Sequence, residues 1–378
     1  MKLVYFSAST IPSHAANSVH VMKMCQAFAD NGHDVELLAP ERGGVSESGA
    51  AVFSAYAVRQ SFRLSRIRRS NRRWGSLSYA YNAARYAQRA RPDMVYGRDI
   101  RACWLAALRG LSVILEVHDL NYIRRSLIDR FVFRALQHAK AFRYLVVISH
   151  ALARDVVAMY PGLKGRVRVA HDGADPVANE TSAAEPGLGR AALRVGYVGN
   201  IYPGRGVELL SAIARRLPWV ELHIVGEWAY GVAGDPGTRS LPANVHVHGF
   251  LPYADAERVR MTCDVLLAPY QRQVYTRGGS NTARWMSPLK IFEYMAAGKA
   301  IVCSDIEVLH EVLEDRKTTL FCPPDDVDAW CAALTQLHED EELRLRLGHA
   351  ARATFSRLHT WRSRAALVLE DPVQAPCT

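Results

Sequence analysis

Short apolar runs alternate with longer amphipathic segments along almost the whole chain. In the first half, the apolar runs predict strands at residues 3–6, 35–38, 52–58, 94–96, 113–117, 144–148 and 167–170. Most of the segments between them, such as 76–90 and 150–159, repeat their apolar residues with the period of a helix. Strands that are apolar throughout and alternate with helices indicate a parallel sheet covered on both faces.

The same pattern returns in the second half, with strands predicted at 195–198, 222–225, 245–248, 265–268, 300–303 and 319–321. Between the halves, residues 179–192 are small and polar without a hydrophobic period, which is typical of a linker. We therefore expect an α/β domain over 1–178, this linker, a second α/β domain over 193–360, and a C-terminal helix and tail over 361–378. One alternative for this C-terminal segment is that it packs back on the first domain. Two doubly wound domains that face a central cleft would place the C-terminal ends of their strands, where ligands bind, around that cleft.

The 378 residues carry a formal net charge of +10, which favours an anionic partner such as nucleic acid, a phosphorylated small molecule or a membrane surface. Arginines are concentrated between Arg59 and Arg91, a stretch without acidic residues that includes Arg66, Arg68, Arg69, Arg72 and Arg73. Apolar residues interleave with these arginines. This pattern suits docking on an anionic bilayer better than binding along a duplex, and a solvated basic face without a partner is the alternative.

The first apolar run is too short for a signal-peptide core, and no run of 18 apolar residues occurs. We therefore expect a cytoplasmic protein, with a peripheral location at the inner face of the cell membrane as a further option. The seven cysteines are scattered without Cys-x-x-Cys spacing, which indicates neither a disulfide framework nor a zinc site.

The most informative helical segment runs from Ser287 to Gly298. We expect Ser287 to cap this helix, Pro288 to occupy its first position and Gly298 to terminate it. Lys290 and Glu293 then share a face near the positive end of the helix dipole. The lysine suits a phosphate and the glutamate suits ribose hydroxyls. An amphipathic helix with a surface ion pair is the alternative.

A glycine-rich turn follows the first strand of the second half. Gly199-Asn200 ends the strand, and Gly204-Arg205-Gly206 leads into a helix, so that backbone amides and the forked charge of Arg205 can approach a phosphate. The spacing matches neither a Gly-x-Gly-x-x-Gly dinucleotide loop nor a Walker loop. Alone it predicts a structural turn, but two cations, Arg205 and Lys290, together with Glu293 suit a nucleoside diphosphate.

His118 follows an apolar strand of the first half, where it can hydrogen-bond a bound sugar or cap the next turn. The pairs His118-Asp119 and His171-Asp172 lack further ligands at a recognisable spacing, so we predict no metal site. Asp326 and Asp328 have the Asp-x-Asp spacing of metal-dependent sugar transfer. They begin a helix after two prolines, however, and are predicted to cap it.

Several motifs taken together resemble the family 4 retaining glycosyltransferases of the GT-B fold, and the resemblance covers most of the chain. They are Asn31-Gly32-His33 after the first helix, Tyr96-Gly97-Arg98, Glu116-Val117-His118-Asp119, Val198-Gly199-Asn200, Gly204-Arg205-Gly206, Val247-His248-Gly249-Phe250 and Phe292-Glu293-Tyr294. The resemblance implies two Rossmann-like domains. It also implies a hexosyltransferase that moves a sugar, with retention of configuration, from a UDP- or GDP-linked donor to a glycan, lipid-linked or small-molecule acceptor. The product would belong to cell-surface polysaccharide or secondary glycan synthesis.

By this resemblance, the second domain binds the nucleotide-sugar through Gly199, Asn200, Arg205, Phe250, Lys290 and Glu293, and Asn17 and Ser18 close over its phosphates. His118 would act at the sugar, and Arg205 and Lys290 at the leaving diphosphate, without a protein base, a metal or another cofactor. Arg98 and the basic stretch would lie on the acceptor or membrane side. Two positions depart from the family pattern: Asn200, where an arginine is common, and Trp285, where a glutamate commonly contacts the transferred sugar.

Two other functions fit parts of the sequence. A nucleotide-sugar 2-epimerase of the same fold would need acid and base side chains crowded at the sugar, and the sequence offers no convincing set. A basic nucleic-acid-binding protein would be expected to show a helix-turn-helix, a finger or an aromatic platform, and none is recognisable. We therefore expect no nucleic-acid partner.

Overall fold

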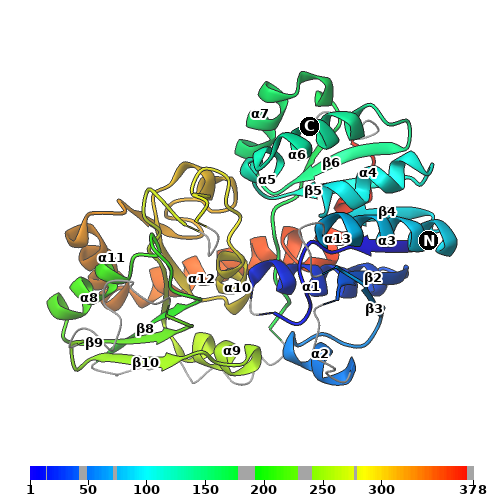
Figure 1. The fold of residues 1–378 in the computed structure, drawn as a ribbon. Coiled ribbons are helices and arrows are strands. Elements are labelled where there is room, and N and C mark those ends of the chain that lie inside the picture. Colours follow the sequence, from blue (N-terminus) through cyan, green and yellow to red (C-terminus); the bar gives the residue numbers. More distant parts are fainter. Residues whose placement is uncertain are drawn as a thin grey trace. The chain divides into compact units, whose positions relative to one another are not determined.

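The chain folds into two units, each built on a parallel sheet (Figure 1). The computed structural model describes residues 1–13, 15–41, 49–70, 75–177, 192–228, 241–275 and 279–372. The first unit comprises Met1–Asp172 and the segment from Trp361 onward, and the second comprises Gly173–Thr360. The predicted linker, 179–192, lies almost wholly outside the described residues.

The first unit contains a seven-stranded sheet in the order β3-β2-β1-β4-β5-β6-β7, as far as the chain is described. Its strands are β1 (Lys2–Phe6), β2 (Asp34–Pro40), β3 (Arg63–Ile67), β4 (Met94–Gly97), β5 (Val113–Val117), β6 (Phe142–Val147) and β7 (Val167–Val169). Its helices are α1 (Ala16–Asp30), α2 (Gly49–Ala55), α3 (Gly75–Ala90), α4 (Ile100–Leu108), α5 (Leu120–Arg124), α6 (Leu127–Gln137), α7 (His150–Met159) and α13 (Trp361–Leu367), with the 3₁₀ turn η1 (Pro161–Leu163). Strand order reverses at β1, which pairs with both β2 and β4.

The strand predicted at 52–58 is wrong. Residues Gly49–Ala55 form helix α2, and the third strand of the sheet lies further on, at Arg63–Ile67. The apolar residues Val52, Phe53 and Tyr56 are buried together, and their spacing is that of one helical face. A short apolar run fits either period, and here Ala50, Ala51 and Ala55 favour the helix.

The second unit contains a sheet of six described strands in the order β10-β9-β8-β11-β12-β13. They are β8 (Leu193–Val198), β9 (Val220–Val225), β10 (Val245–Gly249), β11 (Val265–Ala268), β12 (Ala300–Ser304) and β13 (Leu320–Cys322). The helices are α8 (Val207–Arg216), α9 (Tyr253–Thr262), α10 (Leu289–Ala297), α11 (Val327–Glu339) and α12 (Glu341–Leu358), and Glu307–Glu311 forms the 3₁₀ turn η3. Strand order reverses at β8, between β9 and β11, so ligands are expected beyond the C-terminal end of this strand.

The predicted N-cap of α11 is confirmed. Asp326 caps α11, since its carboxylate accepts a hydrogen bond of 3.0 Å from the amide of Ala329. All cysteines within the described residues are free thiols. Over the same residues, no helix has both the length and the apolar composition that crossing a bilayer requires.

Candidate functional site

The glycine-rich turn between β8 and α8 is packed so tightly that two of its positions have no room for a side chain. A Cβ at Gly204 would lie 1.9 Å from the carbonyl oxygen of Gln273, and a Cβ at Gly206 would lie 1.9 Å from that of Pro269. Both glycines also have positive φ angles, 85° and 76°. This packing fixes the intervening Arg205 beyond the C-terminal end of β8.

Arg205 and Lys290 carry buried cationic atoms that lack hydrogen bonds. Lys290 is 7% exposed, and its Nζ lies 3.7 Å from the ring centroid of Tyr197. The guanidinium of Arg205 lies 5.1 Å from the ring centroid of Tyr270. Within the described parts of the chain, neither Lys290 Nζ nor Arg205 Nε has a hydrogen-bond partner. Burial, and then the charge of Arg205, hold the pKa of Lys290 well below its usual range. Such a pair of cations would be stabilised by a bound anion.

Helix α10 presents Lys290 from its first turn. The helix begins at Leu289, so Pro288 and not Ser287 holds the N-cap position, and this corrects the predicted start. Pro288 has an extended conformation (φ −77°, ψ 124°) and provides no side-chain cap in the described structure, and the positive end of the helix dipole favours an anion there. The hydroxyl of Tyr294 accepts a 2.8 Å hydrogen bond from the amide of Val198 and so holds α10 against the end of β8. Gly298 ends the helix with a φ of 66°, as predicted.

Glu293 is held by an arginine that the sequence analysis missed. Arg260 of α9 is buried, and its Nη1 lies 3.1 Å from Glu293 Oε2. The side chain of Glu293 is 17% exposed, so the carboxylate can still be reached from solvent. The ion pair therefore fixes the orientation of the carboxylate predicted to bind ribose.

Asn200, Gly199 and Phe250 lie along the C-terminal edge of β8, β9 and β10. Asn200 Oδ1 accepts a 3.1 Å hydrogen bond from the amide of Glu227, which ties the β8 turn to the β9 turn. A Cβ at Gly199 would lie 2.9 Å from Lys290 Cε, so glycine is what lets the lysine approach the strand end. Phe250 directly follows β10 and is 55% exposed.

In the first unit, His118 belongs to a buried cluster centred on Glu116. Glu116 Oε1 lies 2.5 Å from His118 Nε2, 3.0 Å from His20 Nε2 and 2.8 Å from Arg364 Nη2. The other oxygen of Glu116 accepts a hydrogen bond from the hydroxyl of Tyr96. Asp172 Oδ1 lies 3.0 Å from His20 Nδ1. We call His20, Glu116, His118, Asp172 and Arg364 the Glu116 cluster.

The electrostatics of this cluster keep His118 neutral and the carboxylates charged. Burial, and then the nearby Arg98, lower the pKa of His118 to about 4. Burial opposes ionisation of Glu116, but Arg364, His20 and His118 hold the pKa of this carboxyl well below its usual range. His20 and His118 likewise outweigh burial at Asp172 and lower its pKa to about 2. At neutral pH, His118 is therefore a neutral imidazole whose Nε2–H donates to Glu116, which leaves Nδ1 as a hydrogen-bond acceptor.

The Glu116 cluster also contains a potential set of metal ligands. Among the described residues, only His20, Glu116, His118 and Asp172 form a group of this kind, with their ligand atoms within 4.8 Å of one another. The guanidinium of Arg364 bonds Glu116 directly and already supplies a positive charge there. The arrangement fits an internal ion network better than a metal site, because a metal ion would lie close to this fixed cation.

Asn17, Ser18 and Arg98 were also predicted to contact ligands. Ser18 is fully buried, and its hydroxyl bonds the carbonyl oxygens of Ser13 and Ala15 at 2.7 Å, so it stabilises the loop before α1 instead of reaching a phosphate. Asn17 Nδ2 donates to Ser9 Oγ at 2.5 Å. Arg98 is buried beside His118, and its Nη1 lacks a hydrogen-bond partner within the described structure.

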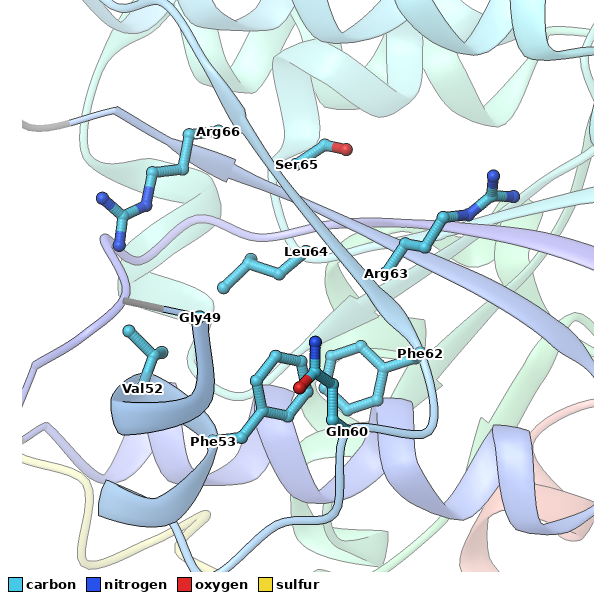
Figure 2. Close-up of a pocket in the computed structure, with 9 residues that line it drawn as sticks. All are labelled: Gly49, Val52, Phe53, Gln60, Phe62, Arg63, Leu64, Ser65 and Arg66. Carbon is cyan, nitrogen blue, oxygen red and sulfur yellow. The ribbon is translucent and has the colours of Figure 1, made fainter. Parts of the chain in front are cut away.

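The basic stretch borders a cavity of about 410 Å³ between α2 and β3. Figure 2 shows the rings of Phe53 and Phe62 beside each other, while the guanidinium groups of Arg63 and Arg66 extend from β3 in different directions. Arg68 and Arg69, just beyond β3, are exposed. Arg72 and Arg73, which were predicted to lie on the acceptor or membrane side, are outside the described residues.

Comparison with known proteins gives matches over both units. Residues 18–177 match the family model described as "Glycosyltransferase Family 4", and residues 192–340 match the family model described as "Glycosyl transferases group 1". The phosphatidyl-myo-inositol mannosyltransferase of Mycolicibacterium smegmatis is 31% identical over 182 residues, which are 47% of this chain and 42% of that protein. The D-inositol 3-phosphate glycosyltransferase of Mycolicibacterium gilvum is 26% identical over 239 residues, or 57% and 49% of the two chains. The matched segments thus span less than half the length of these relatives.

Solved structures match over nearly the whole length. Alr3699/HepE of Anabaena in complex with UDP has a TM-score of 0.71 at 16% identity and covers 98% of both chains. Sucrose-phosphate synthase from Thermosynechococcus elongatus has a TM-score of 0.67 at 17% identity, covering 97% of this chain and 96% of that one. At such identities the likeness concerns the fold alone. Together with the two family matches, it shows that the chain is a glycosyltransferase of family 4 with the GT-B fold.

Proposed function

We propose that the protein transfers a hexose from a nucleoside diphosphate sugar, UDP- or GDP-linked, to an acceptor with retention of configuration. The observation that carries this proposal is the pair of cations at the switch point of the second sheet, the buried Lys290 and the half-buried Arg205, whose Nζ and Nε atoms lack hydrogen-bond partners among the described residues. A diphosphate would supply the missing partners. The structure of Alr3699/HepE, whose fold is similar, was solved with UDP.

The proposed roles follow from charge and geometry. Arg205, Lys290 and the first-turn amides of α10 would neutralise the diphosphate as it leaves, so that no metal is required. Glu293, oriented by Arg260, would accept hydrogen bonds from the ribose hydroxyls, and Phe250 would offer its exposed ring to the base. For His118 we propose that Nδ1 of its neutral imidazole accepts a hydrogen bond from a hydroxyl of the transferred sugar.

We further propose that the acceptor carries a negative charge and is lipid-linked. Arg98 Nη1 is buried beside His118 and has no partner among the described residues, as expected of a group that binds an acceptor phosphate or carboxylate. Two relatives are named for acceptors that bear phosphate, phosphatidyl-myo-inositol and D-inositol 3-phosphate. The arginines beside β3 would attract the anionic membrane in which such a lipid resides.

A thermal-shift panel of UDP, GDP, ADP and TDP, with and without EDTA, tests the donor site. One diphosphate should raise the melting temperature in the presence of EDTA, because only a ligand of the folded state stabilises it. The shift should be lost in Arg205→Ala and retained in Arg215→Ala, a control arginine on α8. No shift with any nucleotide would refute the proposal, and interconversion of a nucleotide-sugar without acceptor would make the protein an epimerase.

A further inference from the structure

Three histidines share one face of the second sheet near its edge. His223 lies in β9, and His246 and His248 lie in β10, the neighbouring strand at the edge of the described sheet (Figure 1). His246 is directly opposite His223 in the register of the two strands. The rings of His246 and His248 both stack on the ring of His223, with centroids 4.9 and 5.4 Å away. The three imidazoles therefore form one cluster, which we call the β10 histidines.

The strand that carries His223 is firmly held. Its neighbours Leu222 and Ile224 point to the opposite face of the sheet, where they are buried in the core of the second unit. His223 is half-buried, whereas His246 and His248 are exposed. The cluster thus combines one fixed inner imidazole with two outer ones that an ion in solvent can reach.

The register of β10 changes at His248. Val247 is opposite Ile224, but the next paired residue, Gly249, is opposite Val225, so His248 is an extra residue in β10. An insertion of this kind bends a strand and re-aims the side chain that it carries. Here it accompanies a close approach, because His248 Nε2 lies 3.1 Å from His223 Nδ1.

The distance between these two nitrogens suits a shared metal ion. Zn–N bonds of about 2.0–2.1 Å in a tetrahedral arrangement separate two ligand nitrogens by about 3.3 Å. The observed 3.1 Å is close to this value. Burial, and then the charges of His246 and His248, lower the pKa of His223 to about 4, so its ring is neutral at pH 7, and the neutral ring is the form that binds metal. A hydrogen bond between the two rings uses one lone pair, whereas a metal ion would use the lone pairs of both.

We propose that His223, His246 and His248 bind one divalent transition-metal ion of the zinc class at the β9–β10 edge of the second unit. His223 Nδ1 and His248 Nε2 are already at ligand spacing, and the exposed His246 would supply a third nitrogen by a change of rotamer. Three imidazoles with an open fourth position are a known zinc ligand set, and imidazole also suits copper and nickel. The ion would tie the edge strand β10 to β9. The inference does not depend on the proposed transfer, because this cluster shares no residue with the proposed diphosphate site.

The test is a titration of the full chain, freed of metal with EDTA and then dialysed, with Zn²⁺ alone. Calorimetry should show one ion per chain, and Zn²⁺ at about 100 times its Kd should raise the melting temperature by about 5–10 °C. His223→Gln, His246→Gln and His248→Gln should each bind Zn²⁺ at least ~10-fold more weakly, since even a group that only orients a metal ligand contributes about 10- to 100-fold to affinity. The matched control is His349→Gln, which changes an exposed histidine of α12 in the same unit and should bind as wild type.

Co²⁺ in place of Zn²⁺ adds a spectroscopic measurement of the same site. Wild type should show the visible absorption of tetrahedral cobalt, and the three glutamine variants of the β10 histidines should lose it. Absence of a thermal shift with Zn²⁺, or unchanged Zn²⁺ affinity in these variants, would overturn the proposal. So would loss of Zn²⁺ binding in His118→Asn, which would place the ion in the Glu116 cluster. The nucleotide shift is measured separately in EDTA, and its absence in wild type would count against the donor site and not against the β10 histidines.

Discussion

Replacing Lys290 with methionine should stabilise the folded protein and at the same time weaken nucleotide binding. Methionine has nearly the length of the lysine stem but no charge. The substitution therefore removes a cation whose Nζ has no hydrogen-bond partner among the described residues, and it keeps most of the packing against Gly199. An ordinary truncation in a core has the opposite effect on stability.

The magnitude follows from two opposing contributions. A buried polar group without a partner costs about 1–3 kcal/mol. The contact of Nζ with the Tyr197 ring, at 3.7 Å from its centroid, returns about 0.5–2 kcal/mol of this cost. The net gain from Lys290→Met is then about 1 kcal/mol, which in a unit of this size raises the melting temperature by about 2–4 °C. The rate of transfer should fall by roughly 100- to 1000-fold, the effect of losing one group that stabilises a developing charge.

The stability difference should also depend on pH. The folded-state pKa of Lys290 lies well below its usual range, whereas the unfolded chain has a value of about 10.4. Between these values, the unfolded state binds more protons than the folded state, so the wild type gains stability as pH rises. The advantage of the methionine variant should therefore be largest at low pH and should shrink as pH approaches 10.4.

Thermal melts of the apo protein across pH, followed by melts with the nucleotide found in the panel, measure both effects. Lys317→Met is the matched control, because this lysine is exposed and forms only a surface ion pair with Glu314, which is worth little. The reasoning would be refuted if Lys290→Met lowered the melting temperature of the apo protein while leaving the nucleotide shift intact. That result would make Lys290 a packing residue.

Arg260→Met should lower the free energy of unfolding by about 3–5 kcal/mol, because it leaves Glu293 without its buried partner. Glu293→Gln should instead lower the affinity for UDP but not for 2′,3′-dideoxy-UDP, and calorimetry measures both affinities. His118→Asn should reduce kcat. The free energy of unfolding of the wild type should fall by about 3 kcal/mol as pH decreases from 6.5 to 4, and the variant should not show this loss. The sign follows because the folded pKa of His118, about 4, lies below the unfolded value of about 6.5; urea unfolding at pH 7 and pH 4 measures the effect. Arg364→Met should destabilise the first unit by about 3–5 kcal/mol, and the added change Glu116→Gln should restore part of this loss, whereas additive effects in a double-mutant cycle would contradict the coupling.

The turn and the helix that carry the proposed donor residues could be predicted from the sequence because they are local. The glycine turn around Arg205 and the helix with Lys290 and Glu293 are each short segments whose turn and helix chemistry is written in adjacent residues. Arg260 could not be found in this way, since its pairing with Glu293 depends on how α9 packs beside α10. The start of α10 was misplaced by a residue because Ser287 and Pro288 both fit the first turn.

The Glu116 cluster shows where sequence reasoning ends. A carboxylate inside the apolar run 113–117 was the available signal, because a buried charge needs partners. Nothing local says that those partners are His20, Asp172 and Arg364, which come from distant segments and meet only through the order of the strands. The helix at Gly49–Ala55 was missed for a related reason, since a short apolar run has no period of its own until tertiary packing selects one.

The position of Arg364 bears on how the protein is made. The first unit takes its sheet from residues before Asp172 but takes α13, and with it the guanidinium that neutralises Glu116, from Trp361–Leu367. During synthesis, the whole second unit must emerge from the ribosome before that charge arrives. The first unit is therefore the earlier to be translated and the later to be completed, and until the last helix docks, the strand end that carries His118 holds a buried carboxylate short of its strongest partner.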